Sequence, residues 1–274
     1  MASTRSRTIA RLRVEPGSPA DLAGRDPADR LGLDGKSEGR AEVEELVEEL
    51  RELQERLWAE ATRSVLLVLQ GLDTSGKDGA IRHVFAGLNP QGCRVAGFKV
   101  PTSTELAHDY LWRVHAACPA RGEIGIFNRS HYEDLVVVRV KGLVPRSTWR
   151  RRFRHVREFE RALHEEGTRI VKVFLHISKD EQRERLQARL DDPTKTWKFR
   201  RGDLDDRKLW DDLMAAYEEA LTRTSTGWAP WHVVPANHKW VRDVAVATLL
   251  VESLRELEPR FPEPEPGLEG LAVV

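Results

Sequence analysis

The sequence predicts a three-layer α/β fold in which helices cover both faces of a parallel sheet. Short apolar runs typical of buried strands alternate along the chain with longer segments of helical periodicity. The first of these runs, Val65 to Leu69, stops at a glycine-rich turn that carries one lysine, and a helix-like segment follows. A continuous apolar run must be covered on both faces, and the strands of a parallel sheet are covered in that way.

The glycine-rich turn fits a phosphate-binding loop. Gly71, Gly76 and Lys77 have the spacing G-x-x-x-x-G-K. This spacing lets successive backbone N–H groups surround phosphate oxygens while the lysine reaches the same anion. The helix that begins at Lys77 adds its N-terminal N–H groups and its dipole. We expect the loop to bind phosphate through Gly71, Thr74, Ser75, Gly76, Lys77, Asp78 and Gly79.

Position 78 of this loop departs from the common pattern. It is an aspartate, where such loops usually carry a serine or threonine whose hydroxyl binds magnesium. Asp73, inside the loop, is the natural metal ligand instead, because Mg²⁺ prefers hard oxygen ligands and keeps most of its waters. The simpler alternative is a strand-to-helix turn in which Asp73 or Asp78 only caps the helix.

The regions on either side of this loop differ in composition. Residues 1–38 mix charged residues, glycine and proline with scattered apolar side chains, and we expect a flexible, loosely docked arm there. A Glu-rich helix is expected over 40–60, packed on the domain or on a second subunit. The catalytic domain is expected over 39–258, and residues 259–274 are expected to form an extended tail. Further strands are expected at 94–100, 123–128, 170–177 and 231–234, and further helices at 77–86, 105–117, 148–166, 179–190, 206–222 and 240–257.

Polar side chains gather after the strand expected at 123–128. Asn128, Arg129 and Glu133 follow its carboxyl end, and ligands of doubly wound sheets bind beyond the carboxyl ends of strands. We expect Arg129 to reach a transferred phosphoryl group, and Asn128 and Glu133 to lie near the metal or the acceptor. Phosphoryl transfer depends on such positioning and on cations. The alternative for Arg129 is a surface ion pair with Glu133 or Asp134.

A second group of cations lies at 183–208, between two predicted helices. This placement predicts a lid that excludes water from the site when it closes. Arg185 and Arg189 are four residues apart and therefore share one helical face. The alternative is a solvated helix face and loop.

Composition limits the classes of function. The 274 residues include 44 Lys and Arg and 44 Asp and Glu, so no net charge attracts nucleic acid or an anionic membrane. Cys93 and Cys118 have no metal-ligand spacing. No apolar run is long enough for a membrane span, and the first residues lack a signal-peptide core. We therefore expect a cytoplasmic protein that binds neither nucleic acid nor membrane.

Five segments together resemble the family-2 polyphosphate kinases. They are GLDTSGKDG, FKVPTSTELAHDYLWR, FNRSHYED, HISKDEQRERLQARLDDPTKTWKF and APWHVVPANHKWVRD. The resemblance implies a P-loop kinase fold with a lid, dependence on Mg²⁺ with Mn²⁺ as an alternative, and a homo-oligomer (dimer or tetramer). It implies reversible phosphoryl transfer between inorganic polyphosphate and AMP or ADP, with GMP and GDP as further candidates.

The resemblance also implies roles for individual residues. Asp73, Lys77 and Arg129 would be catalytic, with Glu133 in the same loop, and Asp73 and Asn128 would lie at the metal. Many members of the family have FDRS where this chain has FNRS, as in members that act on AMP as well as ADP. Phosphates of polyphosphate or nucleotide would be bound by Lys99, Arg185, Arg189, Lys198 and Arg201.

Two other functions fit parts of the same pattern. One is an ATP-dependent nucleoside-monophosphate kinase that resembles thymidylate kinase in its phosphate loop, its strand-end arginine and its lid. The other is a nucleotide-binding switch or scaffold. A switch needs no second phosphate clamp, so the cationic lid argues against it.

Overall fold

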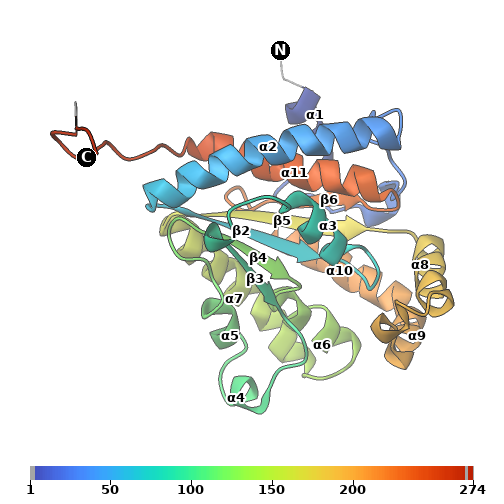
Figure 1. Ribbon diagram of the computed structural model, residues 1–274. Helices are drawn as coiled ribbons and strands as arrows, with labels where there is room; N and C mark the ends of the chain where they lie inside the picture. Colours follow the sequence, from blue (N-terminus) through green and yellow to red (C-terminus); the bar gives the residue numbers. More distant parts are fainter. Residues whose placement is uncertain (1–3, 269–270, 274) are drawn as a thin grey trace.

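The computed structural model describes residues 4–268 and 271–273. Its six-stranded sheet has the order β1-β6-β5-β2-β4-β3 (Figure 1). Five strands pair in parallel, namely β2 (Ser64–Gln70), β3 (Cys93–Gly97), β4 (Ile124–Asn128), β5 (Thr168–His176) and β6 (Trp231–Pro235). The α/β class with a parallel sheet, predicted from the sequence, is confirmed.

Helices cover both faces of this sheet (Figure 1). One layer contains α1 (Thr4–Leu12), α2 (Lys36–Glu60), α3 (Lys77–Val84) and α11 (Lys239–Leu257). The other contains α6 (Val137–Val140), α7 (Arg146–Glu165) and α10 (Trp210–Thr224). Helix α2 packs along α11 and buries Leu46, Leu50 and Leu57. Its apolar face is therefore covered by the same chain, which is the first of the two arrangements expected for it.

Strand β2 lies at the centre of the sheet, between β4 and β5, and all seven of its residues are buried. Leu69 is in register with Asn128 of β4. The carboxyl ends of these two strands therefore lie side by side, so the residues that follow them can form one common site, as expected from the sequence. The segment after β2 and the segment after β4 emerge next to each other at this edge.

The single helix expected over 105–117 is wrong. The chain forms two short helices there, α4 (Ser103–Leu106) and α5 (Trp112–His115). Thr102 and Glu105 form a capping box at the start of α4. The Asp109 carboxylate accepts a hydrogen bond from the Leu111 backbone N–H at 2.9 Å. This local bond competes with helical hydrogen bonding and explains the interruption.

The N-terminal segment is docked, so the flexible arm predicted for residues 1–38 is wrong in the part that the structure describes. Strand β1 (Arg13–Val14) pairs antiparallel with β6 and becomes the edge of the sheet. Leu12, Val14 and Leu22 are buried in the core. The Arg25 guanidinium donates to the backbone carbonyls of residues 11, 12, 13 and 20, which fixes the path of the segment. Residues 1–3 lie outside the described residues.

The C-terminal tail and the lid lie at the periphery (Figure 1). Residues 260–268 are exposed and form no helix or strand, as expected for the tail, whose residues 269–270 and 274 are not described. The lid contains α8 (Lys179–Asp191) and α9 (Arg201–Lys208). The described part of the chain also forms four 3₁₀ turns: η1 (Leu22–Gly24), η2 (Pro90–Gly92), η3 (His131–Asp134) and η4 (Thr196–Lys198).

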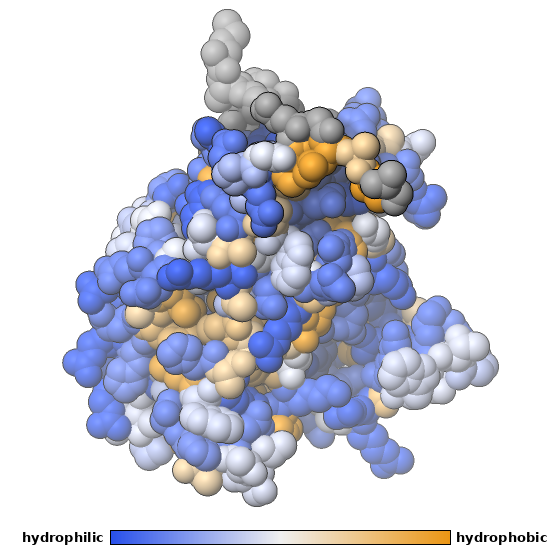
Figure 2. Space-filling model, turned by 60° about the vertical axis from the view of Figure 1, so that its left-hand side comes forward, coloured by the Kyte–Doolittle hydropathy of each residue, from blue (hydrophilic) through white to orange (hydrophobic). Residues whose placement is uncertain are grey.

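The molecular surface on the face shown in Figure 2 is mainly polar, and apolar residues appear on it in small groups. Across the described parts of the chain, no helix combines the length and the apolar character needed to span a bilayer.

Candidate active site

The phosphate loop, residues 71–79, connects the end of β2 to α3. Gly71 and Gly76 have φ angles of +146° and +104°, which side chains rarely tolerate. A Cβ atom on Gly76 would lie 2.1 Å from Nη1 of Arg242, a buried arginine of α11 that packs behind the loop. Gly76 is therefore required both by its backbone conformation and by the close approach of Arg242.

Lys77 points into the curve of the phosphate loop. Its Nζ donates to the carbonyl oxygens of Gly71 at 2.7 Å and Leu72 at 3.2 Å, and its side chain is buried. Burial is the largest cause that lowers the pKa of Lys77 to about 8, and the positive charge of Arg129 acts in the same direction. The carboxylates of Asp73 and Glu133 act in the opposite direction and limit the shift. The ammonium group thus occupies the position from which it can bind a phosphate held by the loop.

Arg129 connects the two strand ends. Its Nη2 is 2.5 Å from Asp73 Oδ1 in the phosphate loop, and its Nη1 is 3.3 Å from Glu133 Oε2. Its backbone has a φ of +64°, and its N–H donates to Leu69 O at 3.0 Å. The ion pair with Glu133 was the simpler alternative for Arg129. It is present, but the second contact, to Asp73, places the guanidinium inside the site.

Glu133 is enclosed between charged and polar groups. Burial raises the pKa of its carboxyl, and the charges of Arg129 and Lys77 oppose that rise. The side-chain amide of Gln70 is assigned the orientation in which its nitrogen faces hydrogen-bond acceptors and its oxygen faces donors. In this orientation the nitrogen donates to Glu133 Oε1 at 3.0 Å and the oxygen accepts from Ser130. The site therefore brings together two cations and two carboxylates: Lys77, Arg129, Asp73 and Glu133.

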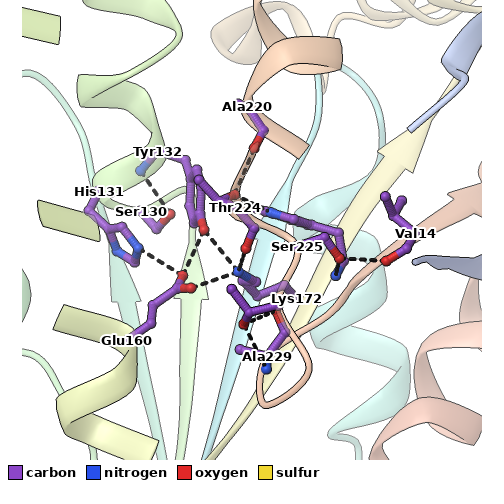
Figure 3. Close-up of polar contacts among 12 residues, drawn as sticks. Val14, Ser130, His131, Tyr132, Glu160, Lys172, Ala220, Thr224, Ser225 and Ala229 are labelled. Atoms are coloured by element: carbon purple, nitrogen blue, oxygen red, sulfur yellow. Dashed lines mark hydrogen bonds and ion pairs between the residues drawn. The ribbon is translucent and has the colours of Figure 1, made fainter. Parts of the chain in front are cut away.

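A buried cluster supports the turn that carries Glu133 (Figure 3). The Lys172 ammonium on β5 donates to Glu160 Oε2 at 2.6 Å, to Thr224 O at 2.8 Å and to the Tyr132 hydroxyl at 3.0 Å. The Tyr132 hydroxyl donates to Glu160 Oε1 at 2.7 Å, and His131 Nε2 is 3.3 Å from the same oxygen. Burial alone would raise the pKa of Glu160, but Lys172 and His131 together lower it. These contacts fix η3, and with it the segment from Arg129 to Glu133.

Arg185, which was expected to bind phosphate, contacts backbone carbonyl oxygens and Glu181 in this structure. Its Nη1 donates to Thr74 O and Ser75 O, its Nη2 donates to Ala236 O and Asn237 O, and its Nε donates to Glu181. All five N–H groups are used, so the guanidinium has no donor left for a substrate phosphate. Arg185 instead holds the back of the phosphate loop against the segment after β6.

The other predicted phosphate contacts are not gathered at the loop. Arg189 Nη1 lies 3.4 Å from Lys198 O and 3.9 Å from an Asp203 carboxylate oxygen, which connects α8 with the rest of the lid. Lys198 is exposed, with its ammonium 5.0 Å from the ring centroid of Trp197. Arg201 and Lys99 are also exposed. These four residues remain candidates for contacts that form when substrate is bound.

Asn128 lies beside Asp78 rather than in the chain of contacts that joins Asp73, Arg129 and Glu133. Its Nδ2 donates to Asp78 Oδ1 at 2.5 Å. Among the described residues, no group of three or more His, Cys, Asp or Glu is arranged for a metal ion. Mg²⁺ at a phosphate site needs only one or two carboxylates. Asp73 and the buried Thr74 hydroxyl, which has no hydrogen-bond partner among the described residues, supply hard oxygen atoms in the loop, so a divalent cation fits these residues.

The structure adds residues that the sequence did not reveal. Gln182 of α8 donates to Asp73 O at 3.2 Å, and Lys141 pairs with Asp206 of α9 at 2.6 Å. With Arg129, these residues line a narrow cavity at the loop. They are separated by many residues along the chain, so only the fold shows that they meet at this cavity.

Known proteins resemble this chain over nearly its full length. Residues 34–262 match the family described as Polyphosphate kinase 2. The AMP/ADP-polyphosphate phosphotransferase of Meiothermus ruber is 54% identical over 97% of this chain and 100% of its own length. The ADP-polyphosphate phosphotransferase of Rhodopseudomonas palustris is 48% identical over 81% of each chain.

A solved structure agrees with these matches. The crystal structure of Polyphosphate Kinase 2 from Arthrobacter aurescens superposes with a TM-score of 0.90 at 46% identity, covering 94% of this chain and 92% of the other. The P-loop kinase fold expected from the sequence is thereby confirmed, and this protein is an enzyme of the kinase class. The chain belongs to the polyphosphate kinase 2 family.

Proposed function

We propose that this protein transfers phosphoryl groups reversibly between inorganic polyphosphate and a nucleotide, with AMP and ADP as acceptors and GMP and GDP as further candidates. One observation carries the proposal: Asp73, Lys77, Arg129 and Glu133 converge at the phosphate loop. The names of the relatives support the choice of substrates. They give no support to a thymidylate-kinase-like enzyme or to a nucleotide switch.

Each residue of the site has a defined task in this reaction. The loop N–H groups and Lys77 bind phosphate, and Arg129 balances the charge that is spread over the transferred group. The attacking atom is a phosphate oxygen of the nucleotide, which is already ionised at neutral pH, so no general base is required. His131 is fully buried and contacts Glu160, which is consistent with a supporting role.

The metal of this reaction is Mg²⁺, with Mn²⁺ as an alternative. Asp73 would be its charged ligand, and Asn128, at the adjacent strand end, would lie near the metal or the acceptor. Asn128 stands where many family members have aspartate, and in this it is similar to the members that act on AMP as well as ADP. When bound, the metal neutralises charge on the phosphate oxygens. Catalysis resides in residues 39–258, with the lid at about 183–208.

The donor assay tests this function. Purified protein is given Mg²⁺, polyphosphate and AMP, ADP, GMP or GDP in parallel, without ATP. We expect ADP and ATP to form from AMP, and chelation of the metal to stop the reaction. AMP phosphorylation that requires ATP and ignores polyphosphate would instead establish the nucleoside-monophosphate kinase. Slow nucleotide hydrolysis with no transfer would favour the switch.

We also propose that the protein works as a homo-oligomer, a dimer or tetramer, in the cytoplasm. Exposed apolar side chains such as Trp112 and Val95 are available for subunit contacts. Light scattering at micromolar concentration tests the assembly, and a monomer under these conditions contradicts it.

A further inference from the structure

A second cavity lies away from the phosphate loop and is surrounded by arginines. It has a volume of about 310 Å³ and lies between α7, the end of α10 and the segment around Gly17. Its lining consists of Gly17, Arg150, Phe153, Arg154, Arg157, Thr222, Arg223 and Ser225. Half of these residues are arginines and none is acidic. None of them lines the cavity at the phosphate loop.

Three of the four arginines have no carboxylate partner within the described part of the chain. Arg150, Arg154 and Arg157 are exposed, and their spacing places them on one face of α7. Two other arginines of the same helix are paired. Arg152 lies 3.1 Å from an Asp134 carboxylate oxygen, and Arg161 lies 2.5 Å from one of Glu158. The cavity thus brings together three cations of this helix that have no carboxylate partner among the described residues.

Stability of the helix does not explain this arrangement. Helix α7 contains seven arginines and three glutamates in a chain of zero net charge, and its first turn has no acidic residue. Cations near a helix N-terminus oppose the helix dipole, and like charges four residues apart repel each other. The second disadvantage applies to Arg150 and Arg154, which are four residues apart. A bound anion would relieve the repulsion.

The opposite wall of the cavity is fixed. The Arg223 guanidinium lies 4.1 Å from the ring centroid of Phe153, and its Nη1 is 2.8 Å from Glu219 Oε1. Thr222 Oγ1 accepts a hydrogen bond from the Ala20 N–H at 2.9 Å, and Ser225 Oγ donates to Val14 O at 2.5 Å (Figure 3 shows the Ser225 contact). The docked N-terminal segment therefore completes a preformed site.

We propose that this arginine cavity is a second anion site, which binds phosphate groups of inorganic polyphosphate at a distance from the phosphate loop. The identity of the polyanion rests on the proposed function. A guanidinium group can donate two parallel hydrogen bonds to the oxygens of one phosphate group. Several arginines along one helix face can therefore bind successive phosphates of a polyanion. Phe153 is the only aromatic residue that the described chain places in the lining, and its ring is covered by Arg223, which leaves no stacking surface there for a nucleobase.

Such a site gives long donors an advantage. A chain held at the arginine cavity stays near the protein while its end exchanges at the phosphate loop, which raises its effective concentration there. A donor shorter than the path between the two sites lacks this advantage. The cavity therefore predicts a preference for long polyphosphate that the phosphate loop alone does not provide.

The test compares the double variant Arg154→Ala/Arg157→Ala with Arg40→Ala/Arg121→Ala. Arg40 and Arg121 are exposed on other segments, so the second variant removes the same charge elsewhere. Binding of fluorescently labelled long-chain polyphosphate is measured by anisotropy over a salt series. We expect the cavity variant to bind several-fold more weakly, with the slope of log affinity against log salt reduced by about one to two. The KM for long donors should rise relative to that for short donors.

Three results would overturn the proposal. The first is wild-type binding and chain-length preference in the cavity variant. The second is equal weakening in the control variant. The third is loss of affinity for a labelled RNA with unchanged affinity for polyphosphate, which would assign the cavity to nucleic acid. The binding measurement needs no turnover, so it still tests the cavity if the protein does not transfer phosphoryl groups from polyphosphate. Unfolding midpoints that match the wild type show that both variants are folded.

Discussion

Burial and then the charge of Arg129 lower the pKa of Lys77, and the carboxylates of Asp73 and Glu133 oppose this shift. The pKa of Lys77 is about 8, with burial as the largest cause. The site is therefore arranged so that phosphate binding and protonation of Lys77 favour each other. A phosphate anion placed in the loop replaces the solvent that burial removed.

This coupling predicts a difference between two pH profiles. Above about pH 8, Lys77 in the free enzyme loses its proton, so kcat/KM for polyphosphate should fall about tenfold per pH unit. In the complex, bound phosphate raises the pKa of Lys77, so kcat should stay level to higher pH. Steady-state rates between pH 6 and 10 measure both profiles. The constant kcat serves as the control for folding, and a kcat/KM that stays flat to pH 10 contradicts the assignment.

The lid is the element whose sequence is most easily misinterpreted. Its density of arginine and lysine suggested a phosphate clamp, but several of these cations are neutralised within the lid. Lys195 pairs with Asp192, and Lys208 pairs with Asp205. Arg185 is directed inward at the phosphate loop. Residue types alone do not distinguish a cation that faces the substrate from one that supports backbone carbonyls.

Arg185 offers a direct test of this support. Arg185→Ala removes donors from four backbone carbonyls and from Glu181, so unfolding should become easier by about 2–4 kcal/mol. Turnover should fall for long and short donors alike, because the loop itself is disturbed. Arg185→Lys keeps the charge but not the five-donor geometry, so it should restore little. Recovery by lysine, or a loss confined to long donors, would show that Arg185 contacts the polyanion.

At the scale of the whole molecule, the sequence predicted what local patterns determine. The strand that ends at Gln70, the loop to Lys77 and the strand end at Asn128 all carry their own periodicity and turn residues, and they lie where expected. The contacts of Gln182, Lys141 and Arg242 join segments that are distant in sequence, so no local pattern predicts them. The N-terminal segment was missed because its apolar residues follow no period. Their partners are β6, α10 and α11, which lie at the other end of the chain.

The docked N-terminal segment makes a prediction that a flexible arm does not. Leu22 is 4% exposed and belongs to the hydrophobic core, so Leu22→Ala leaves a cavity and should lower the free energy of unfolding by about 2–3 kcal/mol. The matched control is Leu268→Ala in the tail, where the side chain is 49% exposed and the expected change is below about 0.5 kcal/mol. Denaturant titration of both variants measures the difference. Because this segment also forms one wall of the arginine cavity, a destabilised Leu22→Ala protein should bind long polyphosphate more weakly even under conditions where it is folded. Equal stability of the two variants would mean that the first 25 residues are not part of the cooperative fold.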